Sequence, residues 1–132
     1  MLRPVLRPLA ALLALAGLVC ACGSGPSDTD RVRTVVEAFG AASAAKDYQQ
    51  LCDDLLSPKL VDEVEQQGLP CEVALKQGLG EVTAPKLTIG QITVKGDDAT
   101  AEVRSTAVGE DPSRDTLELV RVDDAWYIAS LK

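Results

Sequence analysis

The residues of this chain best suited to chemistry are four cysteines and a set of adjacent carboxylates. Cys20 and Cys22 lie near the N-terminus, whereas Cys52 and Cys71 lie in the body of the chain with 18 residues between them. Zinc sites assemble three or four nitrogen or sulfur ligands, and two cysteines in a chain without histidine do not supply them. The sequence therefore predicts no metal site and no cofactor.

The acidic residues come mostly as pairs: Asp53-Asp54, Asp62-Glu63, Asp97-Asp98, Glu110-Asp111 and Asp123-Asp124. Neighbouring side chains point in different directions from a helix or strand, so such a pair does not form a general acid–base dyad. The spacing of a calcium-binding loop is absent, and the serines have no histidine partner. Asp53 or Asp54 could face a pocket as a base, but a solvated helix face is the favoured interpretation. No catalytic residue is predicted.

The first 21 residues have the organisation of an export signal. Arg3 and Arg7 precede an apolar stretch of 11 residues, Leu9 to Val19, and no acid occurs before Asp28. A membrane-spanning helix needs about 20 apolar residues, so this stretch is too short to cross a bilayer. A basic start, a short apolar segment and a small residue before the cleavage point are typical of a signal peptide, predicted over residues 1–21.

Residues 19–22, Val-Cys-Ala-Cys, resemble the bacterial lipobox, with an aliphatic residue three positions before the modified cysteine and a small residue directly before it. Cys22 fits this pattern, whereas Cys20 follows the branched Val19 and has Gly17 at the aliphatic position. We therefore expect Cys22 to become the new N-terminus and to carry a thioether-linked diacylglycerol with palmitate-type chains. The alternative is an ordinary secretory signal with a cysteine nearby by chance.

The charge of the exported chain favours attachment through lipid. Removal of residues 1–21 takes away two arginines and no acid, which leaves 11 basic and 20 acidic side chains, formally −9. This charge opposes binding to nucleic acid or to anionic headgroups, and four aromatic residues are too few for base stacking. Acyl chains on Cys22 would hold the protein at the cell membrane, on its extracytoplasmic face.

Export also predicts the state of the other two cysteines. Outside the cytoplasm an even pair of thiols is usually a disulfide, so Cys52 and Cys71 are expected to form a structural bridge. A redox-active or metal-bound pair is the alternative, and the chain has no C-x-x-C motif to support it. Closing a loop of this length stabilises a fold by roughly 3 kcal/mol.

The remaining sequence divides into a short tether and one folded domain. Residues 22–30 are rich in glycine and serine and read as a lipidated tether, and residues 31–132 form a single domain. Apolar residues at helical spacing predict a long helix capped by Asp30, a second helix around Cys52, a third starting at Ser57-Pro58, and a short fourth starting at Pro70-Cys71.

From Lys86 onward the apolar period becomes two, which predicts four antiparallel strands in a meander. The alternation changes parity at Gly90-Gln91, as a β-bulge would require. One face of the second strand carries small apolar residues around Val103. The fold class is therefore α+β, with N-terminal helices packed on a curved four-stranded antiparallel sheet.

This order of elements resembles the nuclear transport factor 2-like superfamily, and is most similar to its small secreted or lipid-anchored members of actinobacterial type. Three segments carry the resemblance: R-V-R-T-V-V-E-A-F-G-A-A, D-Y-Q-Q-L-C-D-D-L-L and the closing V-R-V-D-D-A-W-Y-I-A-S-L. The resemblance implies a cone, also described as cystatin-like, whose curved sheet can hold an apolar pocket. No position matches a catalytic motif of the superfamily's isomerase-like or cyclase-like enzymes.

Four residues are candidates to line such a pocket: Phe39, Tyr48, Val103 and Trp126. A tryptophan in a terminal strand is, however, more often packed against a sheet face. The expected function is a membrane-anchored, non-catalytic domain that binds a protein partner or a small apolar ligand. The alternative is a pocket enzyme of isomerase or cyclase type that uses an aspartate base and Tyr48.

Overall fold

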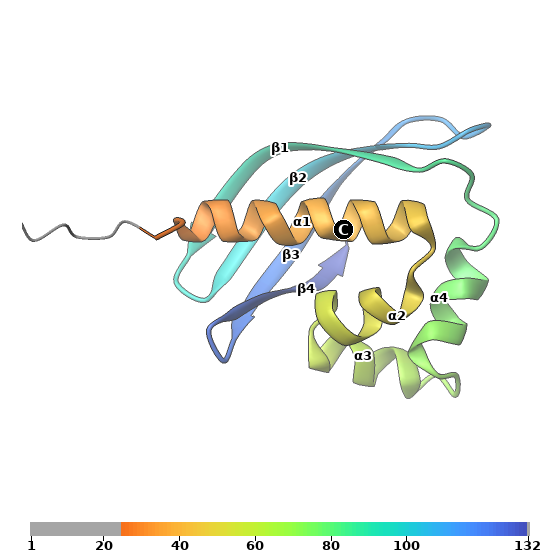
Figure 1. Cartoon of the computed structure of the whole chain (residues 1–132), viewed down its shortest axis with the longest axis horizontal. Helices are drawn as coiled ribbons and strands as arrows, with labels where there is room; N and C mark the ends of the chain where they lie inside the picture. The colour runs from red at the N-terminus through yellow and green to blue at the C-terminus, as the bar shows by residue number, and fades with distance from the viewer. Residues whose placement is uncertain (1–24, 132) are drawn as a thin grey trace, which may run out of the picture.

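The computed structural model describes residues 25–131, in which four helical segments are followed by four strands (Figure 1). The helices are α1 (Asp28–Ala45), α2 (Tyr48–Gln50) with the π-helical turn η1 (Leu51–Leu55), α3 (Pro58–Glu65) and α4 (Cys71–Leu79). The strands are β1 (Lys86–Lys95), β2 (Asp98–Thr106), β3 (Ser113–Val122) and β4 (Ala125–Leu131). The predicted signal segment 1–21 and Cys22 lie outside the described residues.

Helix α1 starts at a capping box formed by Ser27 and Asp30. The Ser27 hydroxyl accepts a hydrogen bond from the Asp30 backbone N–H at 3.1 Å, and the Asp30 carboxylate accepts one from the Ser27 backbone N–H at 3.1 Å. The sequence prediction of Asp30 as the N-cap was therefore wrong by three positions, because both residues take part in one reciprocal motif. As a consequence α1 begins at Asp28, before the domain boundary expected at residue 31.

The short helices form a second unit beside α1. Ser57 caps α3 as predicted, since its hydroxyl accepts a hydrogen bond from the Leu60 N–H at 3.1 Å and Pro58 follows at the first helical position. Backbone pairing then joins this unit to the sheet: Leu56 forms a parallel bridge with Ile128, and the Ser57 N–H donates to the Ile128 carbonyl at 2.8 Å.

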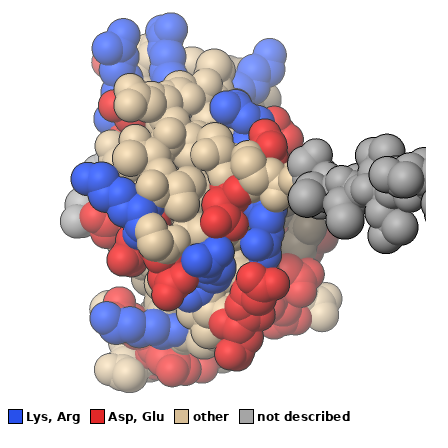
Figure 2. Space-filling view, turned by 90° about the vertical axis from the view of Figure 1, so that its left-hand side faces the viewer, with Lys and Arg blue, Asp and Glu red and all other residues tan. Residues whose placement is uncertain are grey.

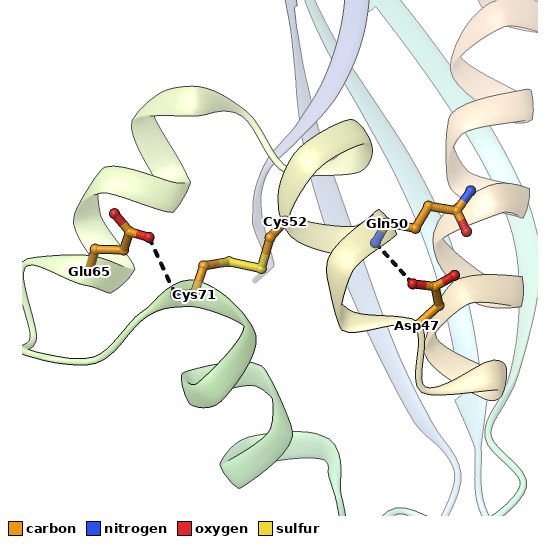
Figure 3. Close-up of a disulfide and its surroundings, with 5 residues drawn as sticks. All are labelled: Asp47, Gln50, Cys52, Glu65 and Cys71. Carbon is orange, nitrogen blue, oxygen red and sulfur yellow. Dashed lines mark hydrogen bonds between the residues drawn. A yellow bond between two sulfur atoms is a disulfide. The ribbon is translucent and has the colours of Figure 1, made fainter.

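The predicted disulfide is present between Cys52 and Cys71 (Figure 3). It joins η1 to the first residue of α4, and both cysteines are buried. The Cys71 backbone N–H, at the start of α4, also donates to the Glu65 carboxylate at 3.4 Å, and the Asp47 carboxylate caps α2 at the Gln50 N–H. The bridge therefore holds η1 and the start of α4 together, with α3 in the loop between them.

The sheet is an antiparallel meander in the order β1-β2-β3-β4, as the sequence predicts. The register of β1 against β2 shifts between Ile89 and Ile92, which places a bulge at the expected glycine. A second shift occurs in β4 opposite Glu118 and Leu119. Figure 1 shows the curved strands passing behind α1, so that α1 covers one face of the sheet.

The core lies between α1, the short helices and the covered, inner face of the sheet. Its fully buried members are apolar side chains from one face of α1, from η1 and from alternate positions of the strands: Val32, Val36, Leu51, Ala101, Leu117 and Ile128. Burial of this area is the main source of stability, because the hydrophobic effect scales with the apolar surface removed from water. No helix within residues 25–131 is long and apolar enough to cross a membrane.

Candidate functional site

The four candidate pocket residues lie on the inner side of the sheet or among the helices that cover it, and two of them are core. Val103 and Trp126 are each 4% exposed and belong to the cluster formed by α1 and the inner sheet face. Phe39 is half-buried and packs against the same cluster. Tyr48 packs instead on a second cluster around Leu51, near the start of the short helices. These side chains fill the space in which the sequence placed a pocket.

Asp53 and Asp54, the candidate bases of the enzyme alternative, are exposed on η1. The only buried polar residue of the described chain is Ser57, so no carboxylate there lies in the apolar surroundings typical of a general base. The Tyr48 hydroxyl is buried and forms no hydrogen bond with any described residue. Tyr48 and the two aspartates therefore do not form an acid–base pair.

A polar cluster that the sequence did not predict closes the inner face beside the first turn of α1. The Asp28 carboxylate accepts hydrogen bonds from Arg121 at 3.1 Å, from Arg31 at 3.3 Å and from the Trp126 indole N–H at 3.3 Å. The Arg121 guanidinium lies 5.3 Å from the centre of the Trp126 ring and is also ion-paired to Asp97 at 2.8 Å. The Asp97 hydrogen bond raises the pKa of Arg121 above its ordinary value, with Asp28 adding to the effect.

This Asp28 cluster links α1 to the β1–β2 and β3–β4 hairpins. Asp97 lies in the turn between β1 and β2, and Arg121 stands opposite Trp126 in the hairpin of β3 and β4. Asp123 and Asp124 form the tight turn of that hairpin with positive φ values of 47° and 64°. Because this turn type is predictable from its two aspartates, the pairing of Arg121 with Trp126 could have been read from the sequence.

The described surface has several open hollows. A groove of about 560 Å³ runs between α1 and the edge strand β1, with Val36, Leu87 and Ile89 along it. A second hollow, of about 470 Å³, lies against the outer face of the sheet, where β1, β2 and β3 meet at the bulge. Its polar lining includes Arg104 and Arg114. The candidate binding surfaces are thus outside the core.

Charge is unevenly distributed over the molecule. Figure 2 shows basic side chains along the upper rim of one face and acidic side chains gathered mainly over its lower half. No group of three or more acidic or cysteine side chains within residues 25–131 is arranged to hold a metal ion. Of the acidic pairs, Asp53 and Asp54 are exposed on η1, whereas Asp97 is ion-paired to Arg121 and Asp124 to Arg31.

Comparison with solved structures identifies the architecture. A Campylobacter jejuni protein described as a "Putative NTF2-like transpeptidase", where NTF2 stands for nuclear transport factor 2, superposes with a TM-score of 0.54 at 13% identity, covering 75% of this chain and 97% of that one. A designed protein of nuclear transport factor 2-like type gives a TM-score of 0.52 at 16% identity, covering 80% and 98% of the two chains. The chain has the nuclear transport factor 2-like fold.

Two further comparisons bear on this nuclear transport factor 2-like chain. TsrD from Streptomyces laurentii has a TM-score of 0.51 at 19% identity, covering 81% of this chain and 89% of that one. Residues 73–131, which include α4 for the most part and the whole sheet, match a family model described as "Putative lumazine-binding". No curated protein matches the chain in sequence. The resemblance inferred from the sequence is confirmed at the level of the fold.

Proposed function

We propose that this protein is a lipoprotein, anchored by Cys22 to the extracytoplasmic face of the cell membrane, whose nuclear transport factor 2-like domain binds a ligand or partner without catalysis. The observation that carries the binding role is the closed core. Val103 and Trp126, which would line an internal reaction pocket, are each 4% exposed and pack against α1. Binding therefore takes place at the surface hollows.

The polar residues support binding over the enzyme alternative. A catalytic carboxylate typically lies inside a pocket that excludes water, yet Asp53 and Asp54 are exposed. Tyr48, the other residue of the enzyme alternative, has its hydroxyl buried without a hydrogen bond to a described residue. The match of residues 73–131 to a family described by lumazine binding supports a small molecule as the ligand.

The anchor proposal rests on the sequence of residues 19–22 and on the structural disulfide, which suits an oxidising compartment. Expressed in a bacterial host, Cys22→Ala should leave the membrane fraction and lose the mass of the lipid. Cys20→Ala is the matched control and should remain lipidated and membrane-bound, because the aliphatic and small positions before Cys22 are unchanged. Release by Cys20→Ala, or membrane retention of Cys22→Ala at unchanged mass, would refute the assignment.

Binding and catalysis can be separated with the small molecules of the host. An extract of these molecules is incubated with excess protein, and the bound fraction and the supernatant are each analysed by mass spectrometry. We expect the wild type to retain compounds that are chemically unchanged. The double variant Asp53→Asn, Asp54→Asn should retain the same compounds, also unchanged. A compound consumed by the wild type and spared by the double variant would establish the enzyme alternative instead.

A further inference from the structure

Two arginines stand directly opposite each other on the outer face of the sheet. Arg104 of β2 pairs in register with Arg114 of β3, and both side chains are exposed. Opposite residues of an antiparallel pair project to the same face with Cβ atoms about 5 Å apart, so like charges there destabilise the sheet. Lys86 of β1, in register with Thr106, is the diagonal neighbour of Arg104 and adds a third cation to this face.

No ion pair with a described residue compensates these charges. The side chains of Arg104 and Arg114 form no ion pair or hydrogen bond with another described residue, whereas those of Arg31 and Arg121 are both paired with Asp28. Such an arrangement is unexpected in a chain with 20 acidic and 13 basic residues. Two unpaired cations side by side repel each other and lower the stability of the fold. An external anion that pairs with both would remove this repulsion.

The space beside the two guanidinium groups suits a small ligand. Arg104 and Arg114 line the outer-face hollow of about 470 Å³, together with the hydroxyl side chains of Thr88 and Thr116. Thr88 stands in register with Arg104, and Thr116 with Glu102 on the next row of the same face. Guanidinium groups bind oxyanions through two parallel hydrogen bonds, and neighbouring hydroxyl groups can donate further ones.

We propose that the outer-face hollow is a binding site for a doubly charged oxyanion of the phosphate type, held between Arg104 and Arg114. Glu102 and Asp115 also line the hollow, so they repel a bare anion and favour a ligand that carries a hydroxyl or amine donor next to its phosphate. This proposal adds a ligand class to the proposed binding role. It holds whether or not the protein is lipid-anchored and whether or not it is an enzyme.

The phosphate could come from a solute or from a lipid headgroup, and the position of the site favours a solute. The chain enters the domain at α1, whose first turn lies at the hairpin ends of the sheet beside Asp97 and Asp124. Arg104 lies six residues along β2 from Asp98, which is about 20 Å at the rise of a strand. The hollow is therefore turned away from the end at which the chain would be anchored.

The test is a titration of the full chain in neutral detergent with inorganic phosphate, followed through the arginine side-chain N–H signals by nuclear magnetic resonance. Arg104→Gln and Arg114→Gln should each weaken binding by roughly 10- to 100-fold, because each removes a charge-assisted hydrogen-bond pair. Arg33→Gln is the matched control, since Arg33 is an exposed arginine of α1, and it should bind phosphate as the wild type does. Glu102→Gln should bind phosphate a few-fold more tightly.

A second measurement uses the unliganded protein. Arg104→Gln should raise the midpoint of thermal unfolding by about 1 to 4 °C without phosphate, because it relieves the cross-strand repulsion. Added phosphate should stabilise the wild type and Arg33→Gln but not Arg104→Gln. The proposal is overturned if phosphate fails to bind, or if Arg33→Gln weakens binding as much as the two outer-face variants. Arginine-dependent binding to micelles containing phosphatidylglycerol, with none to inorganic phosphate, would overturn the solute assignment.

Discussion

Removing the Asp28 carboxylate should separate α1 from the sheet at its first turn. Trp126 is 4% exposed, and Asp28 is the acceptor of its indole N–H, so Asp28→Ala leaves a buried donor without a partner. Such a loss costs about 1–3 kcal/mol, and the loss of a negative charge at a helix N-terminus costs about 0.3–1 kcal/mol more. We expect Asp28→Ala to lower the free energy of unfolding by about 2–3 kcal/mol, or the melting midpoint by roughly 10 °C.

Asp28→Asn tests which part of that loss comes from the hydrogen bond. The amide oxygen can still accept from the indole, so we expect a loss of only about 1 kcal/mol. Thr29→Ala is the control, because Thr29 is the exposed neighbour of Asp28 in the same turn, and it should change stability by less than about 0.5 kcal/mol. Urea unfolding followed by far-ultraviolet circular dichroism measures all three variants.

A double-mutant cycle then assigns the partner. In a Trp126→Phe background the donor is absent, so Asp28→Ala should cost no more than Asp28→Asn does in the wild type. Circular dichroism is needed here because Trp126 is the only tryptophan of the chain and fluorescence is lost with it. Equal costs for Asp28→Ala in the two backgrounds, or equal costs for Asp28→Ala and Asp28→Asn, would refute the reasoning.

Three further predictions concern single features. Cys52→Ser should lower the free energy of unfolding by roughly 3 kcal/mol, which urea unfolding under non-reducing conditions measures, and an unchanged value would show that the bridge contributes nothing. The Ser27 hydroxyl, followed by the Ser27 N–H, lowers the pKa of Asp30 below its ordinary 3.8. The ionised carboxylate therefore stabilises the fold above that pH. The difference in the free energy of unfolding between wild type and Asp30→Asn should be constant at neutral pH and disappear as the pH falls below 3.8. A difference that persists in acid would contradict this. Asp123→Val should cost about 1 kcal/mol or more, because a branched side chain resists a positive φ, while Asp123→Gly should be tolerated, and thermal melts that rank the two variants in reverse would disprove the turn assignment.

Much of the fold could be predicted because local signals agreed with the tertiary structure. Period-two alternation gave the strands, the parity change at Gly90-Gln91 gave the bulge, and Ser57-Pro58 gave the start of α3. The inner face around Val103 was also predicted by alternation, and the structure buries it. These features depend on residues close in the sequence, which is where pattern reasoning is strongest.

The contacts that the side chains make on the two faces of the sheet were harder to predict. Whether Val103 and Trp126 line a pocket or fill a core depends on how closely α1 approaches the sheet, and no local pattern specifies that distance. The pairing of Arg104 with Arg114 depends on the length and shape of the β2–β3 loop, and the contact of Asp28 with Arg121 joins residues 93 positions apart. Such long-range contacts leave no periodic signal in the sequence.

The capping box and the Asp28 cluster together determine how the domain responds to mechanical force. A pull on the chain at Ser27 acts at the first turn of α1, and Asp28 passes the load through Arg121 to β3 and through Trp126 to β4. Because α1 lies across the covered face of the sheet, a pull along the helix axis loads the contacts between helix and sheet together, instead of one residue after another (Figure 1). The domain should therefore withstand tension from its N-terminal side better than its equilibrium stability alone would suggest.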